Sequence, residues 1–178
     1  LIVAPADAAQ GNIQRVFYFH VPLVWVSFLA FIGGTIMSIR YLRGRNSLDD
    51  AWAQAFIKTG WVFTSTVLVT GPLWARPVWG IFWNWGDERL VSFFVMWMMY
   101  NGYLLLRATI ADQEKAARIG AVLAILALMN AALVVGAIYI WKTASHPGPV
   151  FVKQGGSGLA DPTMKLAFWS SFAGFTLL

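Results

Sequence analysis

The residues best suited to chemistry in this chain are two histidines and a tryptophan-rich segment. His20 and His146 are its only histidines, and each lies beside or near a proline, in FHVP and SHPGP. Neutral imidazole is the commonest metal ligand among side chains, and two imidazoles can hold a haem iron axially. The proline after His146 favours extended backbone there, and so a loop that can aim the ring. The alternative for each is an interfacial histidine with its ring among lipid headgroups and its tip in water.

Residues 74–90, WARPVWGIFWNWGDERL, hold four of the ten tryptophans of the chain in one connecting segment. Pro77, Gly80 and Gly86 predict that this segment is irregular, and glycine also lets a flat ligand approach the backbone closely. A belt of membrane-anchoring aromatic residues would be spread over many helix ends instead. The crowding therefore favours a planar aromatic shelf on which a porphyrin or a quinone could stack.

Charged residues near this shelf are candidates for binding acidic substituents. Arginines can pair with haem propionates in charge-assisted hydrogen bonds, although an arginine at a membrane edge also commonly binds lipid phosphate. The candidate ligand-binding residues are His20, His146, Trp79, Gly80, Phe82, Trp83, Trp85, Asp87, Arg89, Arg15 and Arg76.

The composition indicates that these residues are positioned by a membrane protein. The chain is 58% hydrophobic and only 12% charged, against about 25% charged in a typical soluble domain. Its net charge is +5, but the basic residues are too scattered for a nucleic-acid surface and are more typical of topology signals. The absence of cysteine excludes disulfides, thiolate metal sites and covalent haem attachment.

Four apolar stretches are long enough, or nearly so, to cross a bilayer as helices, which takes about 20 residues. They and a partial fifth stretch predict one all-α, polytopic transmembrane domain over residues 1–178, with external segments at about 1–20, 74–90 and 142–165. Because the chain lacks an initial methionine and ends within an apolar run, we expect a fragment of a longer protein. The predicted spans are residues 21–42, 56–73, 91–106, 119–141 and, in part, 166–178.

The distribution of lysine and arginine predicts the orientation, because basic residues are denser in short cytoplasmic loops. The loops after the first and third spans are compact and basic. Counting spans from there places His20, segment 74–90 and His146 together on the opposite, external face. The basic residues that indicate the cytoplasmic side are Arg40, Arg43, Arg45, Lys58, Arg107, Lys115 and Arg118.

Polar and small residues inside the spans predict helix packing. Gly33 and Gly34 indicate a close approach of two helices. The polar residues within the spans are expected to form hydrogen bonds between helices. These are Thr64, Ser65, Thr66, Thr70 and Asn130.

Three ordered motifs resemble the CcmC family (cytochrome c maturation protein C, also called haem exporter protein C). PADAAQG at residues 5–11, followed by His20-Val21-Pro22, is similar to the first external segment of that family. Residues 79–90 resemble its tryptophan-rich WWD segment, and His146 with DPTMK at residues 161–165 resembles its third external segment. The similarity covers almost the whole chain.

This resemblance implies a protein with about six transmembrane helices, four complete and one partial in this chain, in a bacterial inner membrane. Its external, periplasmic face would hold haem b between His20 and His146, against Trp79, Phe82, Trp83 and Trp85. The haem would pass to the chaperone CcmE within an ABC-type complex with CcmA, CcmB and CcmD. A haem-transfer protein for cytochrome c biogenesis, rather than a classical enzyme, is implied.

The chain departs from the family pattern at two positions. Phe82-Trp83 stands where two adjacent tryptophans are usual, and Gly86 is inserted between the last tryptophan and Asp87. Haem synthetase proteins share the WWD segment, but their following sequence is typically Asp-Pro-Lys-like. Two other functions remain open: a quinol or haem electron-transfer subunit of a membrane complex, and an ABC permease subunit without haem.

Overall fold

The computed structural model describes residues 4–7, 10–140, 159 and 161–178. Apart from an isolated bridge between Asp7 and Gly11, the regular structure in these ranges is helical, as the sequence predicts. The elements are η1 (Asn12–Val16), α1 (Phe17–Gly44), α2 (Ser47–Trp79), α3 (Glu88–Thr109), α4 (Gln113–Ile140) and α5 (Pro162–Leu177).

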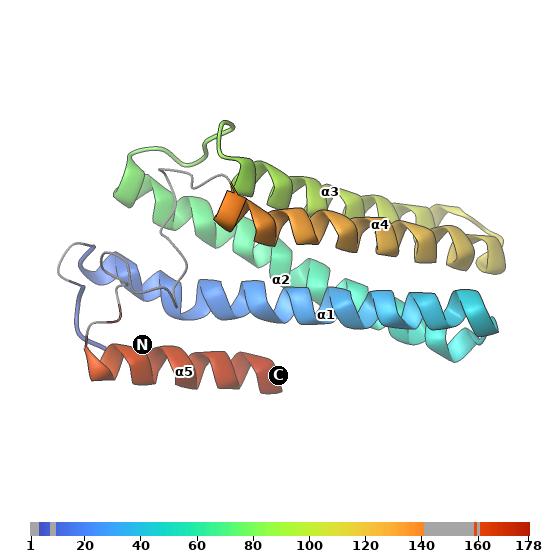
Figure 1. The fold of residues 1–178 in the computed structure, drawn as a ribbon, viewed down its shortest axis with the longest axis horizontal. Coiled ribbons are helices and arrows are strands. Elements are labelled where there is room, and N and C mark those ends of the chain that lie inside the picture. The colour runs from blue at the N-terminus through green and yellow to red at the C-terminus, as the bar shows by residue number, and fades with distance from the viewer. Residues whose placement is uncertain (1–3, 8–9, 141–158, 160) are drawn as a thin grey trace.

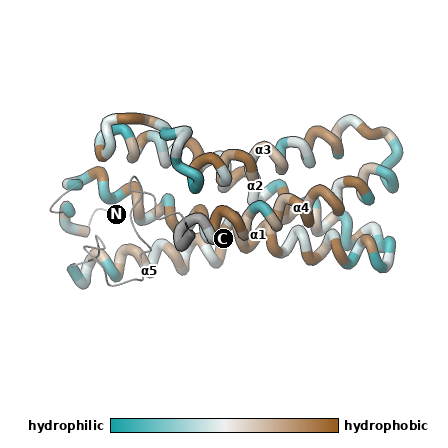
Figure 2. The backbone as a smooth tube through the Cα atoms, turned by 45° about the horizontal axis from the view of Figure 1, so that its top comes forward, coloured by the Kyte–Doolittle hydropathy of each residue, from teal (hydrophilic) through white to brown (hydrophobic). Residues whose placement is uncertain are grey.

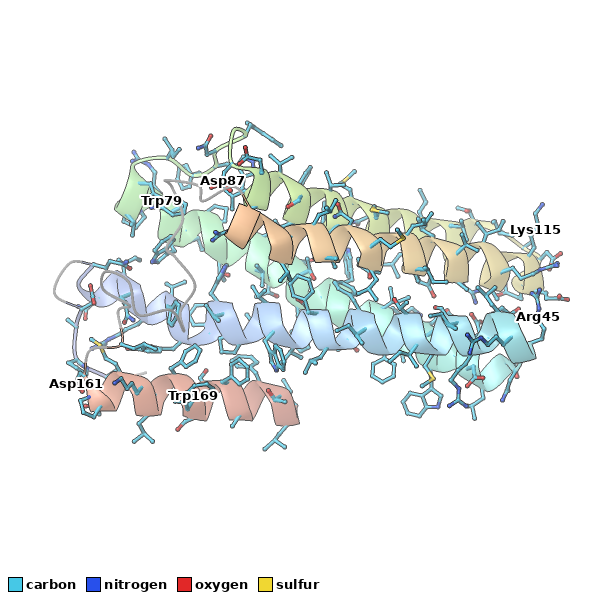
Figure 3. The ribbon with its side chains drawn as sticks, in the orientation of Figure 1. Arg45, Trp79, Asp87, Lys115, Asp161 and Trp169 are labelled. Carbon is cyan, nitrogen blue, oxygen red and sulfur yellow. The ribbon has the colours of Figure 1, made fainter. Side chains whose placement is uncertain are left out.

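The helices run side by side, and their connections alternate between the two ends of the bundle (Figure 1). The most extensive contacts are between α1 and α2 and between α3 and α4; α4 also packs on α1. Of the described elements, α5 contacts α1 alone. Trp79, Asp87 and Asp161 lie at one end of the bundle, and Arg45 and Lys115 lie at the other (Figure 3). The first of these ends is called the aromatic end below.

Three helical stretches in the described part of the chain are long and apolar enough to cross a membrane: Asn12–Gly44, Glu88–Thr109 and Gln113–Gly136. Hydrophobic residues predominate along the middle of the helices, and hydrophilic ones gather toward the ends (Figure 2). The stretch predicted at residues 56–73 lies within α2 but is not among the three, because its hydroxyl groups and Lys58 lower its mean hydropathy.

The hydroxyls of α2 differ in part from the prediction. Thr64 and Thr66 donate to carbonyls of their own helix, to Gly60 O at 2.7 Å and Val62 O at 3.0 Å. Ser65 also donates to its own helix, and it accepts a hydrogen bond from Trp97 of α3 at 2.9 Å. A hydroxyl that donates to a carbonyl of its own helix can lie in an apolar environment, because its hydrogen already has an acceptor. Between α4 and α3, Asn130 Nδ2 donates to the Ser92 carbonyl at 2.9 Å, as predicted.

The aromatic end is more helical than the sequence predicts. α2 continues through Pro72 and Pro77 and ends only after Trp79, so residues 74–79 are helix rather than loop. A proline removes one backbone hydrogen bond and kinks a helix, but it need not end it. The stop comes at Gly80, whose φ of 79° gives the left-handed cap that glycine adopts without steric cost. At the N-terminal end, η1 and the first turn of α1 occupy residues expected to be an external segment.

Close packing of α1 and α2 depends on glycines, as predicted for Gly33 and Gly34. A Cβ at Gly34 would lie 2.7 Å from Cγ1 of Ile57. From α2, a Cβ at Gly60 would lie 2.6 Å from the Phe31 ring. Phe31 is fully buried and stacks on Tyr100 of α3 with ring centroids 3.7 Å apart. Two glycine contacts therefore let α1 approach α2 while one aromatic pair joins α1 to α3.

The end opposite the aromatic end carries the dense basic residues, together with carboxylates that pair with them. Nη2 of Arg107 lies 2.8 Å from Oδ2 of Asp50, and the arginine side chain is only 7% exposed. Arg40 pairs with Asp49 at 3.2 Å. These pairs leave the excess of basic residues at this end meaningful for orientation, because aspartate and glutamate contribute little to the positive-inside rule.

α5 begins at a motif that the sequence already singled out. Asp161 caps the helix by accepting hydrogen bonds from the backbone and side chain of Thr163, and these hydrogen bonds lower the pKa of its carboxyl group. Pro162 occupies the first turn, where its missing N–H costs nothing. Thus DPT marks a helix start at the aromatic end.

Candidate functional site

His20 lies in the first turn of α1, half-buried against the last third of α2. Its Nδ1 is 2.8 Å from Oγ1 of Thr70. A Cβ placed at Gly71 would lie 3.4 Å from Cε1 of the ring, an ordinary van der Waals distance, so the imidazole lies beside Gly71 of α2. The histidine is therefore held by a hydrogen bond and by packing, both from α2.

The face of α2 that holds His20 continues to the first pair of tryptophans. Trp74 follows Thr70 by four residues, which places the two side chains one above the other on a helix. Trp74 meets Trp79 edge to face, with ring centroids 4.8 Å apart. Its indole Nε1 donates to Oε1 of Gln10 at 3.1 Å. One helix face thus connects the histidine to Trp74, and the ring of Trp74 contacts that of Trp79.

The position of Gln10 depends on a closed turn in the PADAAQG motif. Asp7 and Gly11 exchange backbone hydrogen bonds of 2.9 and 3.1 Å, and Asp7 Oδ1 accepts from the Gln10 N–H at 2.8 Å. Gly11 has φ 58° and ψ −137°, a conformation open essentially to glycine alone. The motif therefore fixes the backbone that presents Gln10 to Trp74.

Trp83 and Trp85 form a second, separate aromatic group with α3. Their rings are 5.7 Å apart at 64°, and each meets Phe94 edge to face. Phe94 in turn stacks with Trp97 at 5.8 Å. These rings continue from the loop along α3, whereas the pair described above belongs to α2.

The predicted planar shelf is wrong in its geometry. The rings within each tryptophan pair are steeply inclined, at 83° for Trp74 and Trp79 and at 64° for Trp83 and Trp85. Aromatic rings prefer such edge-to-face contacts because their faces are negative and their edges positive. What the loop does offer is exposed rings: Trp85 is 70% exposed and Phe82 57%. Flat surfaces for a ligand come from single rings rather than from one plane.

Arg76 and Gly80 shape the loop between the two groups. The guanidinium of Arg76 donates to the Gly80 carbonyl at 2.8 Å and lies over the Phe82 ring at 5.7 Å. Gly86 has no positive φ, and its N–H donates to Asn84 Oδ1 at 2.9 Å. Both glycines lie in tight turns, as predicted, and the turn at Gly86 is closed by the Asp87 N–H, which donates to the Asn84 carbonyl at 3.2 Å. Only Gly80 needs a positive φ, because Gly86 has a backbone that other residues can adopt.

The remaining charged candidates lie at the start of α3 or in the N-terminal part of the chain. Asp87 is 1% exposed and caps α3, accepting from the backbone N–H groups of Arg89 and Leu90 at 3.0 and 3.2 Å. Arg89 is half-buried in the first turn of the same helix. Arg15 donates to the Ala4 carbonyl at 3.0 Å, within the N-terminal segment. His146 lies outside the described residues.

An open groove of about 490 Å³ lies beside the second aromatic group, on the outer side of α3 and α4. The groove does not include His20. It is lined by Trp85, Gly86, Glu88, Val91, Ser92, Val95, Asn130 and Leu133.

The side chains at the aromatic end are chemically suited to haem. His20 offers an imidazole ligand, and the exposed rings offer stacking surfaces. Arg76 offers a positive charge in the last turn of α2. The buried Nε1 of Trp83 has no hydrogen-bond partner among the described residues, and a buried donor of this kind favours an acceptor on a ligand. The sequence places Gln10 in an expected external segment, but neither Gln10 nor Thr70 is among the candidate ligand-binding residues. The spacing of Thr70 one helical turn before Trp74 was the available signal.

The family profile described as heme exporter protein C matches residues 1–178. The chain is 35% identical to heme exporter protein C of Bradyrhizobium diazoefficiens over 99% of its length and 66% of that protein. It is 32% identical to a putative cytochrome c biosynthesis ccmC-like mitochondrial protein of Marchantia polymorpha, over 99% of this chain and 73% of the relative. Against heme exporter protein C of Escherichia coli K12 the identity is 31%, over 98% and 69%.

The chain thus spans about two thirds of the length of these relatives. Both the family profile and the relatives cover essentially all of it, including the N-terminal motif and the tryptophan-rich segment. The chain belongs to the CcmC family, the heme exporter protein C family.

Proposed function

We propose that this chain binds haem b at the external face of a bacterial inner membrane and delivers it for cytochrome c maturation. His20 and His146 act as axial ligands of the haem iron. Trp85 and Phe82 supply ring faces for stacking, and Arg76 supplies positive charge for the propionates. The haem is a cargo rather than a resident cofactor, and the chain has no cysteine that could hold it covalently.

One observation carries this proposal: His20 and the tryptophan-rich segment share the aromatic end of the bundle. His20 contacts Thr70 on α2, the same helix face leads to Trp74, and Trp74 contacts Trp79. His20 and Trp79 are far apart in sequence. However, His20 contacts Thr70, and Thr70 precedes Trp79 by only nine residues of helix, a rise of about 13 Å. The proposed metal ligand and the start of the tryptophan-rich segment therefore lie near each other at one end of α2.

The same arrangement suits release of the haem. Stacking rings that are half or more exposed and two imidazoles hold a ligand without enclosing it. We propose that the recipient is the chaperone CcmE, and that CcmA, CcmB and CcmD are the other subunits of an ABC-type complex. Family membership and the names of the relatives support a role in haem export for cytochrome c biogenesis.

The test is an absorption spectrum of the purified protein after haem-replete expression, with wild type beside His20→Ala, His146→Ala and the double variant. We expect a bis-imidazole Soret spectrum in the wild type, and its loss or shift in each single variant. Unchanged spectra and haem content in all three variants would refute the ligand assignment. Absence of any bound tetrapyrrole in the wild type would instead favour a permease subunit without haem.

Delivery needs a separate measurement. Haem-loaded protein is mixed with purified CcmE, the two are separated, and haem is quantified on each. Transfer to the chaperone supports the proposal. Retention of haem together with its rapid reduction by a quinol analogue would favour an electron-transfer subunit instead.

A further inference from the structure

The contact between His20 and Thr70 leaves little freedom for the hydrogen atoms involved. Oγ1 of Thr70 lies 2.8 Å from Nδ1 of His20, 2.9 Å from the Thr66 carbonyl oxygen and 3.3 Å from that of Val67. A hydroxyl group has one hydrogen to donate and can accept others. A neutral imidazole nitrogen either donates or accepts, but a carbonyl oxygen only accepts.

The Thr70 hydroxyl can donate its hydrogen either to Nδ1 of His20 or to the Thr66 carbonyl. Only the second choice places a hydrogen in both short contacts, the one of 2.8 Å to Nδ1 and the one of 2.9 Å to the carbonyl. If the hydroxyl donated to Nδ1, the oxygens of Thr70 and Thr66 would face each other at 2.9 Å with no hydrogen between them, which is repulsive. If the hydroxyl donates to Thr66 O, its oxygen accepts from Nδ1–H of His20, and both contacts are ordinary hydrogen bonds. The second arrangement places the ring hydrogen on Nδ1 and leaves a lone pair on Nε2.

We propose that Thr70 is a positioning residue for His20, fixing both the ring orientation and the Nδ1–H tautomer so that Nε2 is available to a haem iron. The inference rests on the proposed function for the identity of the metal group. Histidines that bind metals generally donate their other ring N–H to a hydrogen-bond acceptor, which orients the ring and raises its basicity. Here the acceptor is a hydroxyl whose own hydrogen is already committed to the backbone of α2.

The surroundings of the ring restrict it further. Gly71, next to Thr70, lies beside Cε1, since a Cβ added at Gly71 would be in ordinary van der Waals contact with the ring at 3.4 Å. Trp74 occupies the following turn of the same helix face, where Gln10 holds its indole. The ring is therefore oriented by α2 before any ligand binds.

The first test measures the tautomer in the haem-free protein. Because the chain has only two histidines, the His146→Ala variant labelled with ¹⁵N-histidine gives ring signals from His20 alone. We expect a protonated Nδ1 and an unprotonated Nε2, unchanged by Thr70→Ser, which keeps the hydroxyl. Thr70→Val removes the hydroxyl at nearly constant volume and is expected to give a mixture of tautomers. A Thr70→Val spectrum identical to that of the parent would overturn the proposal.

Thr66→Val is the matched control. Thr66 lies one turn earlier on the same helix, its side chain is exposed, and its hydroxyl donates to the Val62 carbonyl at 3.0 Å. The substitution keeps the Thr66 backbone carbonyl that accepts from Thr70. We expect the His20 tautomer of Thr66→Val to match that of the parent, and a tautomer altered as much as in Thr70→Val would contradict a specific role for Thr70.

The second test is haem affinity in the chain with both histidines. Loss of a hydrogen bond that orients a metal ligand typically costs about 10- to 100-fold in affinity, so Thr70→Val should weaken haem binding by about that factor, whereas Thr70→Ser and Thr66→Val should not. If the wild type takes up no haem, the proposed function fails, while the tautomer measurement still decides whether Thr70 orients His20. If the wild type binds haem through His20 and Thr70→Val binds equally tightly, the positioning role fails and the proposed function stands.

Discussion

The indole Nε1 of Trp74 donates a hydrogen bond to Oε1 of Gln10 at 3.1 Å, across 64 residues of sequence. This bond fastens the N-terminal segment to the end of α2, beside the face that holds His20. It also fixes one member of the Trp74–Trp79 pair. The N-terminal motif therefore contacts the candidate site through the side chain of Gln10.

Replacing Gln10 with leucine should release this segment. The indole N–H would lose its partner in a half-buried position, at a cost of about 1 kcal/mol. We expect faster proteolysis of the segment before α1 and a change in tryptophan fluorescence. Asn12→Ala, at an exposed position of η1, is the control and should leave both signals unchanged. Equal proteolysis of the two variants would show that the bond does not hold the segment.

Trp85→Ala and Phe82→Ala should separate stability from ligand binding. Both side chains are more than half exposed, and surface substitutions usually change the free energy of unfolding by less than about 0.5 kcal/mol. We therefore expect thermal unfolding in detergent to stay near that of the wild type while haem affinity falls. Wild-type haem affinity in the Trp85→Ala, Phe82→Ala double variant would exclude these rings as stacking surfaces.

Asp87→Ala should destabilise the start of α3. Removing a helix N-cap typically costs about 1 kcal/mol, and Asp87 is almost fully buried. Asparagine caps about as well as aspartate, so Asp87→Asn should retain most of the stability. Thermal unfolding of the two variants measures the capping role. A large loss of haem in Asp87→Asn, with stability intact, would instead indicate that the charge of Asp87 contributes to the site.

Gly60→Ala should loosen the junction of α1 and α2. The added Cβ would lie 2.6 Å from the buried Phe31 ring, and overpacking of this kind costs about 1–3 kcal/mol. Gly102→Ala in α3 is the matched control, because a Cβ there meets nothing within 4 Å. Alanine at that position should be neutral or stabilising, since alanine favours helix more than glycine does. Equal unfolding temperatures for the two variants would argue against close packing at Gly60.

At the opposite end, Arg107→Leu should destabilise the protein by about 2 kcal/mol, below the roughly 3 to 5 kcal/mol of a fully buried pair. The reason for the smaller value is that Asp50 is 18% exposed and keeps some access to water. Adding Asp50→Asn removes the unpaired charge while keeping an acceptor for Gln54, which bonds Asp50 at 3.1 Å. We expect the double variant to recover most of the loss in detergent unfolding. A double variant as unstable as the sum of the single ones would show that the pair is not coupled.

The sequence by itself determined the helical class, the approximate positions of the apolar stretches and the family. Composition and long apolar runs suffice for this because the backbone N–H and C=O groups of a segment in lipid must be hydrogen-bonded internally, which a helix achieves within the segment itself. Counting helices also placed His20 and residues 74–90 at one end, and the structure confirms this for both. The close approach at Gly33 and Gly34 followed from their missing side chains.

Only the tertiary structure decided how the residues of the aromatic end are arranged. Pro77, Gly80 and Gly86 suggested a loop, but α2 continues past Pro77 and ends only at Gly80, where the backbone adopts a positive φ. The tryptophans suggested one shelf, but their rings form two groups. Trp74 and Trp79 pack on each other at the end of α2, whereas Trp83 packs on Phe94 of α3. Thr70 and Gln10 carry no local sign of their partners, since a hydrogen bond to a residue 50 or more positions away depends on helix packing.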